Sequence, residues 1–139
     1  MNNIWQQSAS IERLTDWNKD TAAHHLGIEF IEIGNNFIRG RLHVDQKTTQ
    51  PMGVLHGGVS VVLAETLGSC GAALAMPENT QLVGLDINAN HIRGVTKGWV
   101  EGKATPLHLG RRTHVWGIDI TDEQGRLVCI SRLTVAILS

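Results

Sequence analysis

Glu65 is the only charged residue between Lys47 and Glu78, and it lies within a long apolar run. An ionised carboxylate is costly in apolar surroundings unless it is paired or used for chemistry. A carboxylate in such a place is suited to act as a nucleophile or as a general base. Two structural interpretations are also open: the helix face that carries Glu65 reaches solvent, or the carboxylate pairs with an arginine such as Arg93 or Arg132.

Two adjacent glycines, Gly57 and Gly58, follow His56 at the start of the same apolar run, and Gln50 precedes them. If a helix begins there, its first backbone N–H groups have no partner within the helix, and its dipole favours negative charge. Without Cβ atoms, a ligand can approach these groups closely. The pattern predicts a site for an oxyanion; the structural alternative is that the glycines only permit close helix packing.

The spacing of these groups predicts how the site is assembled. Gly57 and Glu65 are eight residues apart, which is roughly 12 Å along a helix, so the two cannot act on one carbonyl carbon. A two-fold dimer with antiparallel neighbouring helices would bring Gly57 of one subunit to Glu65 of the other. Ser69, one turn after Glu65, shares its helix face and could orient Glu65 or a water molecule.

The elements that must position these residues can be read from the hydrophobic pattern. Residues 57–75 are apolar on nearly every face, which predicts a buried helix that Pro77 stops. Before it, residues 10–18 predict a short amphipathic helix and 45–55 a loop. Residues 25–44 predict a β-hairpin, because two apolar runs flank Gly34 and two asparagines.

After the helix, four β-like runs are separated by turn-forming residues: 81–92, 98–108, 111–121 and 126–138. We expect them to form an antiparallel meander. The complete order predicts an α+β fold, with a six-stranded antiparallel sheet wrapped around a central buried helix. One helix leaves part of such a sheet uncovered, so we expect the chain to form oligomers.

Composition limits the class of protein. The 139 residues are 42% hydrophobic and 18% charged with a net charge of -1, which predicts a single domain over residues 1–139 and argues against binding to nucleic acid. The N-terminus lacks a signal-peptide pattern, so the expected location is cytoplasmic. Residues 54–76 are long enough to span a membrane, but Glu65 and several glycines favour a buried helix over a membrane segment.

Metal and redox chemistry are not indicated. Cys70 and Cys129 are far apart in the sequence and neither lies beside a histidine, which predicts two buried free thiols. The seven histidines are dispersed, without the spacing of metal ligands. We therefore expect no metal and no cofactor.

Four segments carry a family resemblance: QPMGVLHGGVSVVLAETLGS at 50–69, VGLDINANHIR at 83–93, PLHLGRR at 106–112 and DEQGRLVCISRLTVAIL at 122–138. Together they resemble the hotdog-fold acyl-CoA thioesterases. Within this family they are most similar to the branch of the 1,4-dihydroxy-2-naphthoyl-CoA thioesterase of menaquinone synthesis and the enterobactin-pathway proofreading thioesterase. The resemblance implies a hotdog fold, a homodimer as the catalytic unit, usually a homotetramer, and an acyl-CoA or an acyl or aryl carrier protein as substrate.

The resemblance also implies roles for individual residues. Glu65 would be the nucleophile or general base, and the Gly57 N–H would polarise the thioester carbonyl. Gln50 and His56 would help to hold that oxygen or the aromatic acyl group, and Ser69 would position water. The coenzyme A side of the site would be formed by Gly84, His91, Ile92, Arg93, Gly94, His108, Leu109, Gly110, Arg111, Arg112 and Thr113.

Relatives often have Ser or Pro at the position of Gly94, so one side-chain contact to phosphate would be missing. The three arginines of the coenzyme A set could bind phosphates through charge-assisted hydrogen bonds. The activity that follows is hydrolysis of an aromatic acyl thioester to a free acid and a thiol. Two alternatives are a 3-hydroxyacyl thioester dehydratase or hydratase of the same fold, and a non-catalytic acyl-CoA-binding protein.

Overall fold

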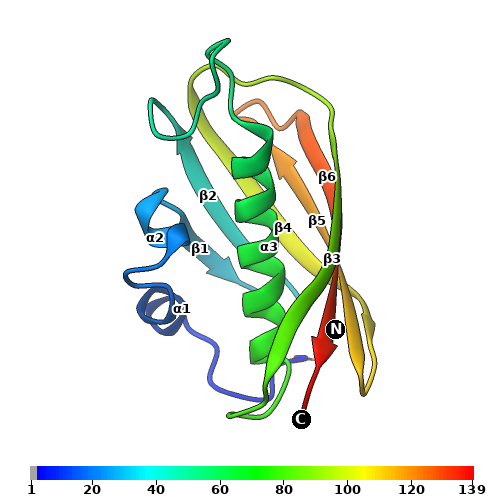
Figure 1. Cartoon of the computed structure of the whole chain (residues 1–139). Coiled ribbons are helices and arrows are strands. Elements are labelled where there is room, and N and C mark those ends of the chain that lie inside the picture. The colour runs from blue at the N-terminus through cyan, green and yellow to red at the C-terminus, as the bar shows by residue number, and fades with distance from the viewer. Residues whose placement is uncertain (1–2) are drawn as a thin grey trace.

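The computed structural model describes residues 3–139, and one long helix, α3 (Gly57–Leu74), lies at its centre (Figure 1). Its glycines allow the sheet to come close. A Cβ atom at Gly71 would lie 2.7 Å from the ring of Trp116, and one at Gly68 would lie 2.8 Å from Leu133 Cδ2. The predicted buried helix at 57–75 is confirmed.

Six strands form one antiparallel sheet that curls around α3 (Figure 1). The predicted hairpin is confirmed, since β1 pairs antiparallel with β2. Along the sheet the order is β1-β2-β4-β5-β6-β3. In chain order the strands are β1 (Glu29–Ile33), β2 (Ile38–Val44), β3 (Leu82–His91), β4 (Gly98–Leu109), β5 (Thr113–Thr121) and β6 (Leu127–Ile137).

The meander is confirmed for β4, β5 and β6 but is wrong for β3. This strand does not pair with β4, which follows it in the sequence; it pairs with β6, from Leu82 opposite Ile137 to His91 opposite Cys129. The connection at residues 92–97 therefore passes from one edge of the sheet to the middle. Strand propensity marks a strand but does not identify its partner, which depends on packing against α3.

The N-terminal region contains one element more than the sequence predicted. Helix α1 (Ile11–Trp17) begins at the N-cap Ser10, whose hydroxyl accepts from Arg13 N at 3.1 Å. Residues 25–28 are not the predicted strand: a short helix, α2 (Ala22–His25), precedes β1. Gly27 has φ +81°, a left-handed conformation that suits the chain just after a helix.

The segment before α1 crosses beneath the C-terminal end of α3. Its side chains bond carbonyl groups in the last helical turn and just after it: Gln7 Nε2 donates to Ala73 O and Met76 O, and Gln6 Nε2 donates to Ala75 O. These bonds satisfy acceptors that lack partners within a helix. The N-terminal segment thereby holds the C-terminal end of α3 in place.

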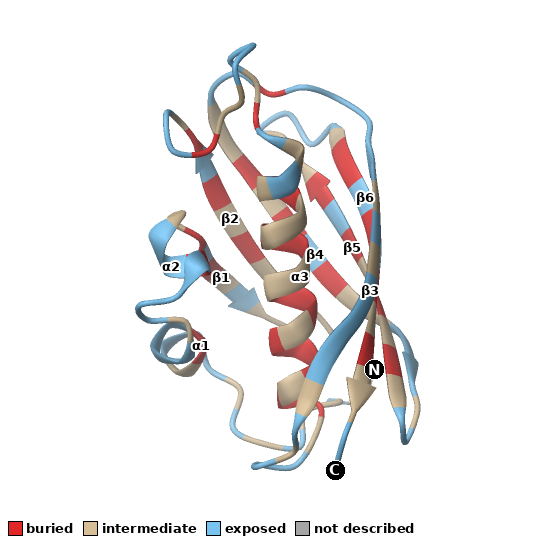
Figure 2. Cartoon of the chain, viewed as in Figure 1, coloured by how far each residue is buried: buried red, intermediate tan, exposed pale blue. Residues whose placement is uncertain are grey.

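The edge strand β3 is mostly exposed, whereas in β2, β4, β5 and β6 buried residues alternate with partly buried or exposed ones (Figure 2). Val83 and Leu85 have 47% and 61% of their surface accessible. By length and composition α3 could also span a membrane, yet half of it is buried within the curled sheet. A long edge strand with exposed apolar side chains is a surface on which another chain can pair.

Candidate functional site

The first turn of α3 leaves one backbone donor free. The carbonyl oxygen of His56 accepts from Val59 N at 2.9 Å and Ser60 N at 3.2 Å, and its ring Nδ1 accepts from Gly58 N at 2.8 Å. Of the first four backbone N–H groups of α3, only that of Gly57 has no partner among residues 3–139. The sequence predicted free donors at both glycines; His56 occupies that of Gly58, so a single oriented donor remains.

A buried threonine fixes the chain that leads into α3. Thr48 is 1% exposed, and its hydroxyl accepts from Asp45 N at 2.9 Å and donates to His43 O at 3.0 Å. Its carbonyl accepts from His56 N at 2.8 Å. The residue before Gly57 is therefore anchored to a rigid loop, which sets the direction of the free N–H.

Gln50 is oriented by the turn in which it lies. Gly53 N donates to Gln50 O at 2.8 Å across a turn with Pro51 second and Gly53 fourth, positions that these residues favour. The side-chain Oε1 of Gln50 accepts from Met52 N. Its Nε2, which has no partner among residues 3–139, is thus the end that can donate to a ligand.

The free Gly57 N–H and Gln50 line one cleft of about 320 Å³. Half a dozen of the predicted site residues meet there: Gln50, Gly57, His91, Ile92, Arg93 and Gly94. The sequence did not identify the other lining residues, which are Val54, Leu55, Ser60 and Val128. The spacing signal for Ser60 was present, because it follows Gly57 by three residues and shares its helix face.

Glu65 lies two turns further along α3, beside Gly84 of β3. A Cβ atom at Gly84 would overlap the Glu65 Oε2 atom. The carboxylate is half-buried and has no hydrogen-bond or ion-pair partner among residues 3–139, so the suggested pairing with Arg93 or Arg132 is wrong. Ser69, one turn on, is also half-buried.

Apart from Gly84, which lies beside Glu65, the residues expected on the coenzyme A side divide into two groups. His91 to Gly94 lie at the N-terminal end of α3, whereas His108 to Thr113 form the β4–β5 turn at the opposite end (Figure 1). There Gly110 N donates to Thr113 O at 2.9 Å, and Arg111 and Arg112 line a hollow with Met76. A single chain does not bring the two groups together.

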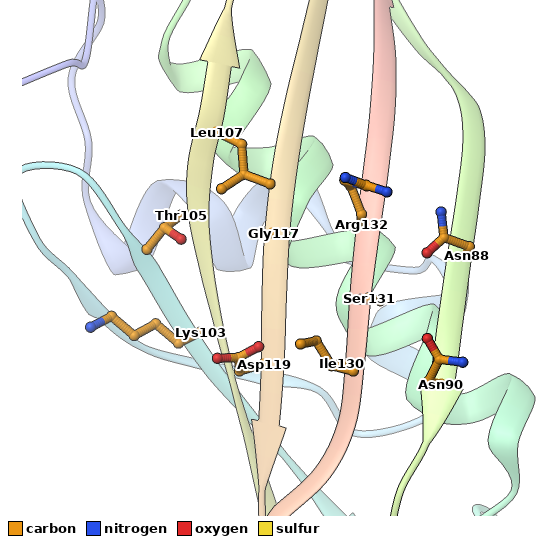
Figure 3. Close-up of a pocket in the computed structure, with 10 residues that line it drawn as sticks. All are labelled: Asn88, Asn90, Lys103, Thr105, Leu107, Gly117, Asp119, Ile130, Ser131 and Arg132. Carbon is orange, nitrogen blue, oxygen red and sulfur yellow. The ribbon is translucent and has the colours of Figure 1, made fainter.

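Another hollow, of about 530 Å³, lies on the face of the sheet away from α3 (Figure 3). Gly117 forms its floor, because it has no side chain, and Leu107 and Ile130 lie beside it. None of the site residues expected from the sequence lines it. Among residues 3–139, no three His, Cys, Asp or Glu side chains are grouped to hold a metal ion.

Burial shifts the pKa of three groups in the strands and in α3. Desolvation lowers the pKa of His114 on β5, and the nearby His108 lowers it further. Burial raises the pKa of the Cys70 thiol to about 11, although a hydrogen bond from Asn18 opposes this shift. Burial also raises the pKa of the Cys129 thiol. Both cysteines are free and buried, as the sequence predicted.

Comparison with known proteins gives the cleft its chemical context. Residues 52–129, which include Gly57 and Glu65, match the model of the thioesterase superfamily. The chain belongs to this family. It therefore has the hotdog thioesterase fold, and it is a thioester hydrolase.

Relatives of this thioesterase match nearly all of its length. It is 47% identical to the 1,4-dihydroxy-2-naphthoyl-CoA hydrolase of Escherichia coli, over 97% of this chain and 99% of that one. It is 44% identical to the proofreading thioesterase EntH of Cronobacter turicensis, over 97% and 98%. A solved thioesterase of Haemophilus influenzae superposes with a TM-score of 0.95 at 47% identity, covering 98% of this chain and 95% of that chain.

Proposed function

We propose that this thioesterase hydrolyses an aromatic acyl-CoA of the 1,4-dihydroxy-2-naphthoyl type, with Glu65 as the reacting carboxylate and the Gly57 N–H as the oxyanion donor. The observation that carries the proposal is the single free N–H at the start of α3, in a cleft that Gln50 also lines. The substrate class rests on the 47% identity to the E. coli hydrolase. Aryl groups on a carrier protein are the competing substrate, because EntH is also a relative.

In this mechanism the thioester oxygen accepts from Gly57 N–H and from Gln50 Nε2. Glu65 either attacks the carbonyl carbon and breaks the C–S bond, or takes a proton from a water that attacks it. The first route gives a mixed anhydride, which water then hydrolyses, and a thiolate, which takes a proton from solvent. The oxygen becomes negative in both routes, and a fixed N–H stabilises that charge. Isotope from labelled water in a single turnover tests the routes: label in Glu65 supports the anhydride, because direct attack places the label in the released acid alone.

The proposed catalytic unit is a dimer in which Glu65 and Gly57 of one site belong to different subunits. Two turns of helix separate them within a chain, roughly 12 Å. The exposed strand β3 supports the dimer, because pairing with a second β3 would cover Val83 and Leu85. A two-fold axis there would also place opposite ends of the two subunits side by side. The group His91 to Gly94 of one subunit would then lie closer to the group His108 to Thr113 of the other.

We further propose that two such dimers associate into a tetramer. The outer face of the sheet supports this step, since Leu107 is 62% exposed and Ile130 43% exposed beside the hollow at Gly117. A second dimer on this face would remove both side chains from water. Light scattering gives the mass in solution, and a species of two chains alone would limit the assembly to the catalytic dimer.

A thiol-release assay with several substrates tests the activity. We expect turnover to be highest with 1,4-dihydroxy-2-naphthoyl-CoA and benzoyl-CoA, low with hexanoyl-CoA and palmitoyl-CoA, and lost in Glu65→Gln. Normal turnover in Glu65→Gln would refute the role of the carboxylate. A preference for an aryl carrier protein over every CoA ester would replace the proposed substrate. Hydration of crotonyl-CoA without hydrolysis of the aromatic esters would point instead to a hydratase.

Mixed subunits test the shared site. Glu65→Ala and Gly57→Ala chains are each expected to be inactive alone. Unfolded together and refolded, half of the dimers are mixed and each has one intact site, so activity returns to about a quarter of wild type. If both groups act within one chain, no mixed dimer has an intact site and activity does not return.

A further inference from the structure

Strand β3 approaches the carboxylate of Glu65 so closely that a side chain at position 84 would displace it. A Cβ atom on Gly84 would overlap Glu65 Oε2 and lie 3.6 Å from Glu65 Cδ. The same Cβ would be 3.7 Å from Leu133 Cδ1, which closes the side toward β6. The carboxylate oxygen therefore lies against the β3 backbone, in the place that the Cβ atom of another residue would take.

The backbone is irregular at the same position. The pairing of β3 with β6 shifts register between Gly84 and Asp86, so Leu85 is an extra residue in the strand. Such a bulge bends a strand locally and alters where it approaches its neighbours. The irregularity coincides with the contact to the only carboxylate on α3.

We propose that Gly84 is a positioning residue for Glu65: its missing side chain allows the carboxylate to lie against β3 in the orientation that reaches the thioester. This inference rests on the proposed role of Glu65. It gives Gly84 a function different from the coenzyme A contact that the family resemblance implies. In this structure Gly84 adjoins the carboxylate, whereas His91 to Gly94 of that set line the Gly57 cleft.

The two roles predict different kinetics for Gly84→Ala. A methyl group there displaces the carboxylate by about 1 Å, and a misplacement of that size costs about 100-fold in kcat. KM and inhibition by free coenzyme A should change little, because the nucleotide does not touch the added methyl group. A coenzyme A contact would give the reverse: KM and the inhibition constant rise while kcat is preserved.

A double-mutant cycle with Glu65→Asp gives the decisive readout. The shorter side chain withdraws the carboxylate from β3 by one methylene, so it leaves room for the methyl group. Glu65→Asp alone should be slow, and adding Gly84→Ala to it should lower kcat by less than about threefold, compared with about 100-fold in the wild-type background. Coupling of this size is not expected if the methyl group merely weakens the strand.

Gly117→Ala is the matched control, because it also places a methyl group on a strand but on the outer face, at an ordinary 3.4 Å from Leu107 Cδ1. This face belongs to the proposed contact between dimers and not to the shared site, so kcat at saturating substrate should remain near wild type. If Gly84→Ala keeps normal kcat while Glu65→Gln is inactive, the inference fails and the proposed function stands. If Glu65→Gln is itself active, the proposed function fails first. Equal losses from Gly84→Ala in both backgrounds would also overturn the inference.

Discussion

The imidazole of His91 lies over Gly57, so that a Cβ atom built on the glycine would come within 2.8 Å of His91 Nε2. The residue that provides the free N–H is therefore covered on one side by the end of β3. His91 and the helix start cannot both keep their places if a side chain is added at position 57.

Gly57→Ala should therefore move the oxyanion donor while the helix still forms. The expected loss is about 100-fold to 1000-fold in kcat, the usual effect of losing one such donor. Steady-state kinetics and circular dichroism measure the two effects. In a His91→Ala background the added methyl group has room, so the further loss from Gly57→Ala should be smaller; an equal loss would show that the contact with His91 is not its cause.

Charge on the exposed strand β3 should separate the subunits. Leu85→Lys places a like charge on both sides of the proposed strand pair, where desolvation is costly. We expect analytical ultracentrifugation to show monomers, with loss of hydrolysis and little loss of secondary structure. Ile11→Lys is the control, because Ile11 is 39% exposed on α1, away from β3. An active monomer of Leu85→Lys would contradict the shared site.

Stability should fall at acid pH partly through His114. Burial holds its folded-state pKa below the ordinary 6.5, so the unfolded chain binds the proton more readily. The unfolding free energy is then highest above pH 6.5, declines as the pH falls through 6.5, and levels off below the folded-state pKa. Urea titrations across this range should give a shallower decline for His114→Gln.

The exposed His25 on α2 is the matched control for that measurement. His25→Gln replaces an exposed imidazole and leaves the buried His114 in place, so its decline should follow the wild type. If His114→Gln also follows the wild type, other groups account for the acid sensitivity.

Neither cysteine should react with thiol reagents in the folded protein. Burial raises the pKa of Cys70 to about 11, and both side chains are buried, so reactive thiolate is scarce and inaccessible. A chromogenic disulfide at about pH 8 should label no thiol before unfolding and both afterwards. Rapid labelling of the native protein would contradict this, and its absence keeps the background of the thiol-release assay low.

The sequence predicted features that depend on neighbouring residues. An apolar run with Pro77 after it predicted α3, and Gly34 with its asparagines predicted the hairpin. The lone charge of Glu65 and the glycines after His56 identified the two parts of the candidate site, because burial of a charge and a helix start are both visible in local composition. The family resemblance added the hotdog fold and the thioesterase activity, which the comparisons confirm.

Contacts between distant residues were decided only by the tertiary structure. β3 pairs with β6 and not with β4, because strand partners follow from packing around α3. The side chain of His56 reaches Gly58 N and leaves Gly57 as the free donor, which depends on a rotamer. Gly84 meets Glu65 through a shift in strand register. The two strand relationships depend on where a second segment lies in space, and the His56 contact depends on the rotamer of one side chain, so local composition gives none of the three.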